Sequence, residues 1–217
     1  RFIDETLAEH RPHDAVLSEE AADDSNRLTA DRVWIIDPLD GTQEYSEFDR
    51  ADWAVHIALW ERKDTNGNPS NEGSITEAAV ALPAYNMTLS THQLPKTPER
   101  FDGSPRLVVS RTRATREAVI VAEALGCQVA RLGSAGAKTM AVVLGEVDIY
   151  VHAGGMYQWD SAAPIAVAAA AGLYTSRIDG SPLIYNRRDA WLPDLVVCQQ
   201  HLAQQVIDAL REGRLDA

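Results

Sequence analysis

The sequence lacks the features that would place it in or across a membrane. It contains no apolar run long enough to span a bilayer and shows no signal-peptide pattern. Cysteine is scarce too, since Cys127 and Cys198 are the only two. They have neither metal-ligand spacing nor a disulfide framework, which is typical of packed thiols in a reducing compartment. We therefore expect a cytoplasmic protein that makes no membrane contact.

Positive charge is also in short supply. Lys and Arg number 20 against 32 Asp and Glu, which gives a net charge of −12. Such an acidic chain disfavours non-specific binding to a polymeric nucleic acid or to an anionic membrane. A small phosphorylated substrate is compatible with this charge if metal ions supply positive charge locally. Hydrophobic residues make up 45% of the 217, which is enough to bury the core of one large or two small domains.

The most informative stretch covers residues 31–45. Val33 to Ile36 form an apolar run of β-branched and aromatic residues that predicts a buried strand. The strand then ends in the segment D-P-L-D-G-T, residues 37–42. Pro38 fixes its own φ and pushes the preceding residue towards extended backbone, and Gly41 permits a left-handed step. We therefore expect two carboxylates, three residues apart, on a stiff bend at the end of a buried strand.

Two carboxylates held this close repel each other unless a cation neutralises them. Mg²⁺ suits such a position, because it takes oxygen ligands, often from only one or two carboxylates, and completes its octahedron with water and substrate phosphate. The Leu39 carbonyl lies between the two acids as a further candidate ligand. Gly41 and Thr42 look like the start of a short helix, whose unpaired N–H groups favour an anion such as phosphate. The alternative is an ordinary Asx/Pro/Gly turn with solvated acids.

Three segments, in this order along the chain, carry a resemblance to a known family. They are S-E-E at 18–20, W-I-I-D-P-L-D-G-T at 34–42 and W-D-S-A-A at 159–163. The set resembles the signatures of the inositol monophosphatase superfamily, which comprises Mg²⁺-dependent, lithium-sensitive phosphatases. The regions between the motifs follow the family pattern as well, so the resemblance covers nearly the whole chain. It implies a layered sandwich of α+β and α/β type with the αβαβα architecture of that family.

The resemblance also assigns roles to individual residues. It implies two or three Mg²⁺ ions held by Glu19, Asp37, the Leu39 carbonyl, Asp40 and Asp160. It implies a catalytic group of Glu19, Asp37, Asp40 and Thr42 around a metal-activated water that attacks phosphorus in line with the departing oxygen. The upstream G-D-x-x-T segment of the family, which helps to activate this water, is not found in this sequence. We therefore expect that an N-terminal segment is missing.

The order of predicted elements divides the chain into two domains. Residues 1–104 are predicted as an α+β metal- and phosphate-binding domain, incomplete at its N-terminus, with mostly antiparallel strands. Within it, His56 is interpreted as a packed or edge strand residue and not as a ligand, and the polar segment 61–73 predicts a hairpin loop. Residues 105–217 are predicted as an α/β substrate domain. Its alternating elements are a strand at 106–110, a helix at 113–126, a strand at 128–132, a helix at 136–144 and a strand at 147–152.

Candidate substrate contacts come from both domains. Ser110 lies at the carboxyl end of a predicted strand, where ligands commonly bind, although capping of the next helix explains it equally well. Ser134 lies at another strand–helix junction, and Lys138 follows in the first turns of that helix. A lysine there suggests a partner anion such as a second phosphate, or else a surface side chain. Asp160 also fits a helix N-cap. The predicted substrate-binding set is Leu39, Asp40, Gly41, Thr42, Ser110, Ser134, Lys138 and Asp160.

Finer details point to one branch of the family. The segment Q-E-Y at 43–45, the W-D-S-A-A motif and Lys138 resemble the bacterial CysQ-type 3′(2′),5′-bisphosphate nucleotidases more than the inositol phosphatases. The resemblance implies removal of the 3′-phosphate from adenosine 3′,5′-bisphosphate, a by-product of sulfate assimilation, to leave AMP. Phosphoadenylyl sulfate is a related candidate substrate. The alternatives are an inositol monophosphatase, a fructose-1,6-bisphosphatase, or a non-catalytic sensor that binds metal and nucleotide. The family often forms homodimers, which makes a dimer one candidate assembly.

Overall fold

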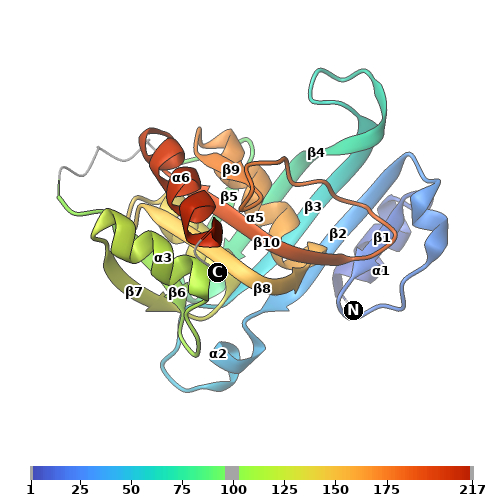
Figure 1. The fold of residues 1–217 in the computed structure, drawn as a ribbon. Helices are drawn as coiled ribbons and strands as arrows, with labels where there is room; N and C mark the ends of the chain where they lie inside the picture. The colour runs from blue at the N-terminus through green and yellow to red at the C-terminus, as the bar shows by residue number, and fades with distance from the viewer. Residues whose placement is uncertain (1, 96–102, 216–217) are drawn as a thin grey trace.

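The computed structural model describes residues 2–95 and 103–215 and contains two five-stranded sheets. The first sheet has the strand order β1-β2-β3-β4-β5, in which β1 and β2 are parallel and all other neighbours are antiparallel. Its strands are β1 (Ala15–Ser18), β2 (Arg32–Asp40), β3 (Ala54–Lys63), β4 (Pro69–Leu82) and β5 (Met87–Ser90). The β3–β4 hairpin projects from the body of the protein (Figure 1).

The second sheet follows in the other half of the chain, with the order β7-β6-β8-β10-β9. Strands β7, β6 and β8 are parallel, whereas β10 runs antiparallel to both of its neighbours. Its strands are β6 (Arg106–Ser110), β7 (Gln128–Leu132), β8 (Ile149–Tyr157), β9 (Tyr174–Ser176) and β10 (Trp191–Cys198).

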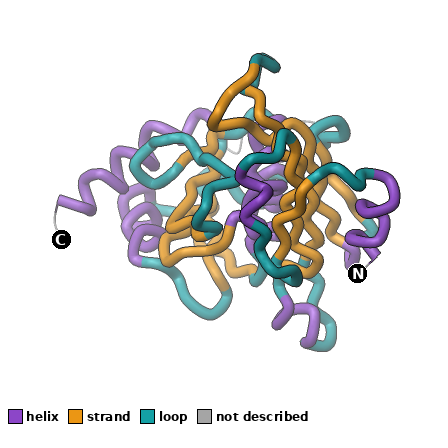
Figure 2. Tube along the Cα trace, turned by 90° about the vertical axis from the view of Figure 1, so that its right-hand side faces the viewer, coloured by secondary structure: helices purple, strands orange, loops and turns teal. Residues whose placement is uncertain are grey.

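Two helices, α4 (Ala135–Val143) and α5 (Gln158–Ala170), fill the space between the sheets. α5 contacts β2, β3 and β4 of the first sheet as well as β8, β9 and β10 of the second, and α4 packs beside it. Buried apolar residues of both helices join residues of both sheets in one hydrophobic core. Figure 2 shows helices lying between the two groups of strands.

The second sheet is buried on both faces. Val108 and Tyr150 belong to the core shared with α4 and α5, whereas their neighbours Leu107, Val109 and Ile149 belong to a second core. That second core is closed by α3 (Arg116–Leu125) and α6 (Ala203–Leu215). Successive strand residues point to opposite faces, so burial on both sides explains the continuous hydrophobic runs of β6 and β8. The layers are therefore the first sheet, α4–α5, the second sheet and α3–α6, with α1 (Phe2–His10) beside β1 (Figure 1).

The predicted helices and strands of residues 106–152 are present within a few residues of their expected ends. The predicted hairpin loop at 61–73 is wrong in extent, because β3 continues to Lys63 and β4 begins at Pro69. In this projecting hairpin the backbone N–H and C=O groups are paired between β3 and β4, so polar residues can form strands there without a buried face. The domain boundary at 104/105 falls between the sheets but stays a prediction, since α4 and α5 pack against both. Within the described residues, no helix is both long enough and apolar enough to cross a membrane.

Candidate active site

A β-bulge in β2 places Asp37 and Asp40 on the same face of the first sheet. Asp37 lies opposite His56 of β3, and Asp40 lies opposite Ala54, with an irregular register between them. Three steps along β2 therefore match two steps along β3, so one extra residue is accommodated at Pro38–Leu39. Residues two apart on a strand share a face, and cross-strand partners share it too. Both carboxylates consequently point into the same buried space, where α4 and α5 pack.

The carboxylate of Asp40 is held by the N-terminus of α4. The backbone N–H of Gly136 donates to Oδ2 at 2.6 Å, and the N–H of Ala135 donates to Oδ1 at 3.3 Å. Burial opposes ionisation of this group, but the neighbouring His56 and these N–H donors outweigh it and lower the pKa of Asp40. The anion at the N-terminus of α4 is therefore a side chain of the protein itself.

His56 is packed inside β3, as the sequence suggested, but its contact with Asp40 was not predicted. Its imidazole is fully buried; Nε2 lies 3.2 Å from Asp40 Oδ2, and Nδ1 lies 3.1 Å from the carbonyl oxygen of Trp159. A Cβ on Gly136 would lie 2.1 Å from Nε2, so the glycine makes room for the ring. Burial would lower the pKa of His56, but Asp40 and Asp37 overcome this and raise it. One imidazole thus joins the D-P-L-D segment to the W-D-S-A-A segment.

Among the acids of the site, Asp37 has the most strongly raised pKa. It is almost completely buried, and its Oδ1 accepts a hydrogen bond from the Leu39 N–H at 2.9 Å. Burial, reinforced by the negative charges of Asp40 and Glu19, raises the pKa of Asp37 to about 8, although His56 opposes the shift. A cation at this position would relieve both the burial penalty and the repulsion.

Asp160 lies at the start of α5, in the third helical position. The helix begins at Gln158, so the prediction of Asp160 as N-cap is wrong: the N-cap is Tyr157. Oδ2 of Asp160 accepts a hydrogen bond from the Tyr157 N–H at 2.7 Å, as the acidic partner in a capping box. Burial raises the pKa of Asp160 to about 6, with smaller contributions from the charges of Asp40 and Glu19. These couplings put Asp160 in the same electrostatic cluster as the acids of β2.

Glu19 differs from the other three predicted acidic ligands. It follows β1, is exposed, and its side chain makes no hydrogen bond to any described residue. Its backbone N–H donates to the carbonyl of Ile36 at 3.4 Å, which keeps it beside the end of β2. Its charge contributes to the raised pKa values of Asp37 and Asp160. Glu19 therefore lies near the cluster without a fixed partner.

The turn after β2 is closed by a short helix, α2 (Thr42–Ser46). Gly41 is its N-cap with φ of +88°, the left-handed conformation that the sequence predicted. A Cβ there would lie 2.9 Å from the Cβ of Ser134, so the glycine also permits close approach of the second half of the chain. Thr42 Oγ1 donates to the Leu39 carbonyl at 3.3 Å. The roles of Leu39, Gly41 and Thr42 in binding metal or phosphate stay predictions.

Ser134 and Lys138 occupy buried positions at the start of α4. Ser134 is the N-cap, and its Oγ accepts from the Ala137 N–H at 2.8 Å. Lys138 is only 3% exposed, so its interpretation as a surface side chain is wrong. Its Nζ donates to the carbonyl oxygens of Gly133 at 2.5 Å and of Ser134 at 2.9 Å. Burial lowers the pKa of Lys138 to about 8, while Asp40 and Glu44 oppose the shift. Its predicted contact with a substrate anion is untested.

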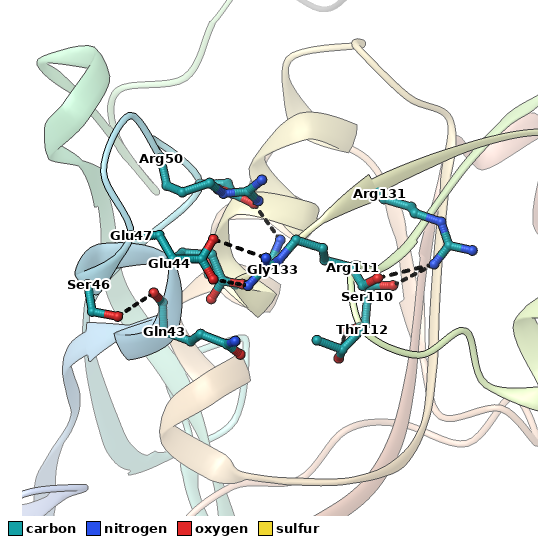
Figure 3. A network of polar contacts seen from close by, with 12 residues as sticks. Gln43, Glu44, Ser46, Glu47, Arg50, Ser110, Arg111, Thr112, Arg131 and Gly133 are labelled. Carbon is teal, nitrogen blue, oxygen red and sulfur yellow. Dashed lines mark hydrogen bonds and ion pairs between the residues drawn. The ribbon is translucent and has the colours of Figure 1, made fainter.

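An ion-pair network fastens α2 to the second half of the chain (Figure 3). The guanidinium of Arg111 donates to Glu47 at 2.8 and 3.0 Å and to the buried Glu44 at 3.2 Å. Beside it, Asp52 accepts from the Gly133 N–H at 2.6 Å and pairs with Arg50. The sequence motifs did not predict this network, although the spacing of Glu44 and Glu47, three residues apart, is typical of acids that share one face.

Ser110 lies at the end of β6, as predicted, next to this network (Figure 3). Its Oγ is 3.3 Å from Thr112 Oγ1. The N-cap of the following helix α3 is Thr115, which accepts from the Ala118 N–H, so the alternative that Ser110 caps this helix is wrong. The part of Ser110 in substrate binding stays a prediction.

The donor set has the chemistry of a Mg²⁺ site. Glu19, Asp37, Asp40 and Asp160 supply hard oxygen atoms, and burial together with mutual repulsion leaves Asp37 and Asp160 with raised pKa values. Within the described residues, no three His, Cys, Asp or Glu side chains converge as a protein-only metal site would require. Mg²⁺ does not need such convergence, because it commonly takes one or two carboxylates and fills its other positions with water and phosphate. These residues therefore fit ions that are completed by substrate.

Comparison with known proteins identifies the class. Residues 1–214 match the sequence profile of the inositol monophosphatase family, and the chain belongs to this family. Members of the family are generally metal-dependent phosphatases. The chain is 51% identical over 210 residues to the 3′-phosphoadenosine 5′-phosphate phosphatase of Mycobacterium tuberculosis, a match that covers 95% of this chain and 77% of that protein. It is 33% identical over 172 residues to the 3′(2′),5′-bisphosphate nucleotidase CysQ of Escherichia coli, covering 74% of this chain and 65% of that protein.

The fold agrees with this assignment. Inositol monophosphatase-II from Staphylococcus aureus superposes with a TM-score of 0.78 at 19% identity, covering 99% of this chain and 80% of that chain. At this identity the likeness establishes the fold alone. The predicted family and its layered α/β architecture are both confirmed.

Proposed function

We propose that this protein is a metal-dependent phosphomonoesterase that hydrolyses adenosine 3′,5′-bisphosphate to AMP and inorganic phosphate. The reaction class is supported by the cluster of the buried Asp37 and Asp40 with the half-buried Asp160, whose charges are coupled. The substrate is supported by the 51% identity to a 3′-phosphoadenosine 5′-phosphate phosphatase, which is the single observation that carries it. Phosphoadenylyl sulfate, which also has a 3′-phosphate, is the second proposed substrate.

Two or three Mg²⁺ ions would be held by Glu19, Asp37, Asp40, Asp160 and the Leu39 carbonyl. Bound Mg²⁺ supplies positive charge that makes phosphorus easier to attack and the 3′-oxygen easier to release. Asp40 is kept in place by the N–H groups of α4, so it needs no reorganisation when substrate binds. Because the acids serve as ligands, none is assigned as a covalent nucleophile. Water adds its oxygen to phosphorus, and the departing 3′-oxygen takes up a proton.

Thr42 and the backbone N–H groups at the start of α2 would donate hydrogen bonds to the phosphate oxygens. The hydroxyl of Thr42 now donates to the Leu39 carbonyl, and it would have to turn from this partner to reach a phosphate. Its pairing with Leu39 keeps the turn closed in the meantime. The network of Arg111 with Glu44 and Glu47 holds α2 in position (Figure 3).

The proposal is tested by phosphate release with Mg²⁺ from adenosine 3′,5′-bisphosphate, inositol 1-phosphate and fructose 1,6-bisphosphate, with and without Li⁺. We expect a strong preference for the nucleotide and inhibition by Li⁺ at a Mg²⁺ position. Equal rates on all three substrates would indicate a broad phosphatase. Mg²⁺ binding without release from any substrate would contradict the enzyme and favour a sensor.

We also propose a cytoplasmic location and, as the family often forms them, a homodimer. The location is supported by the two thiols, which burial makes unreactive: it raises the pKa of Cys127 to about 11 and that of Cys198 to about 12. Fractionation of the natural host and the mass of the purified protein in solution would test the two statements separately.

A further inference from the structure

Three aromatic side chains lie together directly beside Asp160. The ring of Tyr157 stacks on Trp159, with centroids 4.6 Å apart and an interplanar angle of 12°. It also meets Trp191 edge to face at 5.5 Å and 85°. Tyr157 and Trp191 are each 46% exposed, although aromatic rings of this size usually contribute most when buried. We call Tyr157, Trp159 and Trp191 the aromatic platform.

The backbone builds this platform before any ligand arrives. Tyr157 at the end of β8 lies opposite Trp191 at the start of β10, so the two side chains are cross-strand neighbours. Gly155 has φ of +85°, and a Cβ there would lie 1.6 Å from the indole of Trp191. Only a glycine lets the indole lie across β8 in this way. A surface that is fixed in advance costs little entropy when it binds a ligand.

The platform is joined to the acids of the active site by the main chain. The Tyr157 N–H donates to Asp160 Oδ2 at 2.7 Å, and the Trp159 carbonyl oxygen lies 3.1 Å from His56 Nδ1. The scissile phosphate of a nucleoside 3′-phosphate is on C3′, and the base is on C1′ of the same ribose. A substrate with its phosphate at the acids therefore carries its base about one sugar width away, and the platform is the exposed aromatic surface that adjoins Asp160 along the chain.

We propose that the aromatic platform binds the purine base of the substrate by stacking, and so selects nucleotides over other phosphate esters. This inference rests on the proposed function of the same site. A base is flat and neutral, and it stacks on aromatic rings without needing a charged partner. Inositol 1-phosphate and fructose 1,6-bisphosphate have no aromatic ring, so the platform contributes no stacking energy to their binding.

The test compares two ligands that differ only in the base. AMP and ribose 5-phosphate are titrated against the Mg²⁺-loaded protein by calorimetry, with tryptophan fluorescence as a second signal of stacking. We expect Tyr157→Ala and Trp191→Ala to weaken AMP binding roughly ten- to a hundredfold, the usual effect of losing one stacked aromatic. Ribose 5-phosphate binding should not change, and Tyr157→Phe should bind AMP like the wild type. Tyr85→Ala is the matched control, because Tyr85 is a 59% exposed aromatic in a different element, η2 (Pro83–Tyr85).

The outcomes separate this inference from the proposed function. Unchanged AMP affinity in both alanine variants would contradict the proposed role of the platform. An equal loss of affinity for AMP and ribose 5-phosphate would contradict it too, because it would mean that Asp160 had moved. If the wild type releases phosphate from adenosine 3′,5′-bisphosphate in either of these cases, the proposed function survives alone. If it releases none while AMP binding depends on Tyr157, the proposed function fails and the platform belongs to a nucleotide sensor.

Discussion

The two halves of the chain contribute unlike groups to the candidate active site. β2 supplies the carboxylates of Asp37 and Asp40, whereas the start of α4 supplies N–H donors and the ammonium of Lys138. Alone, the first half would be a repulsive acidic cluster, and the second would be a helix end with unpaired donors. Their contact reduces both the repulsion between the acids and the number of unpaired N–H donors at α4. The difference teaches that the site is also part of the interface between the halves, so changes to it should affect activity and stability together.

The largest effect is expected from Asp40→Asn, which removes the charge where the halves meet. An amide cannot accept from both Ala135 and Gly136 as a carboxylate does, and it loses its attraction to His56. We expect turnover to fall at least about a hundredfold, beyond the range of residues that merely orient metal ligands. Unfolding free energy should fall by about 1–3 kcal/mol, the cost of buried groups left without partners.

Phosphate release and thermal unfolding measure the two losses. Asp31→Asn is the control, because it removes the same charge from a side chain that is 92% exposed. Wild-type turnover in Asp40→Asn would remove this residue from the ligand set.

The second prediction concerns how the stability of the metal-free protein depends on pH, through the acids of the first half. The pKa values of Asp37, about 8, and Asp160, about 6, exceed those of the unfolded chain, near 3.9 for aspartate. The folded state therefore holds more protons across this window, and the free energy of unfolding falls as pH rises from about 4 to about 8. Mg²⁺ favours the ionised acids, so it should raise Tm more at the upper end of the window than at the lower.

Thermal unfolding across this pH window in EDTA and in Mg²⁺ checks the sign. Asp37→Asn should flatten the metal-free profile, because it removes the group with the most strongly raised pKa. A Tm that rises with pH across the window in EDTA would contradict the prediction.

A smaller effect is expected from Gly133→Ala, which crowds the contact between the halves. The new Cβ would lie 2.0 Å from Glu44 Cδ, so the buried carboxylate must move. Overpacking of this kind costs about 1–3 kcal/mol of unfolding free energy, measured by denaturant unfolding. The same substitution in a Glu44→Ala background should cost much less. Equal costs in both backgrounds would mean that the backbone, and not Glu44, resists the change.

The smallest effect is expected from Glu47→Gln. Its bond to Arg111 lies at the rim of the interface, where the Glu47 side chain is 38% exposed and water and salt screen the pair. Tm should barely change, and the change should shrink further at high salt. Glu44→Gln should cost more, because the Glu44 side chain is only 8% exposed. If Glu47→Gln were the more damaging of the two, the assignment of rim and centre would be reversed.

The layered fold was predicted through the resemblance of three short motifs to a family and is confirmed, whereas the metal-binding roles of the acids in those motifs stay predictions. The acids lie in short motifs, and the alternation of strands and helices follows from hydrophobic periodicity. The sequence did not predict the role of His56, since a histidine in an apolar strand looks like any packed residue until its cross-strand neighbour is known. The N-cap position was missed at Asp160 because it depends on where α5 begins, which Tyr157 and Gln158 decide. Lys138 looked exposed because its carbonyl partners lie in an irregular loop.

The extra residue at Pro38–Leu39 changes the parity of the chain. In an unbroken strand, positions 37 and 40 would be odd and even, and one carboxylate would face away from the other. The bulge brings both carboxylates onto the same face of the sheet. Removing one residue between the two acids would abolish the bulge and leave them two apart, still on one face of the sheet, but without the bend in which the Leu39 N–H donates to Asp37. With a spacing of three, the bulge is therefore as much a part of the candidate active site as the acids are.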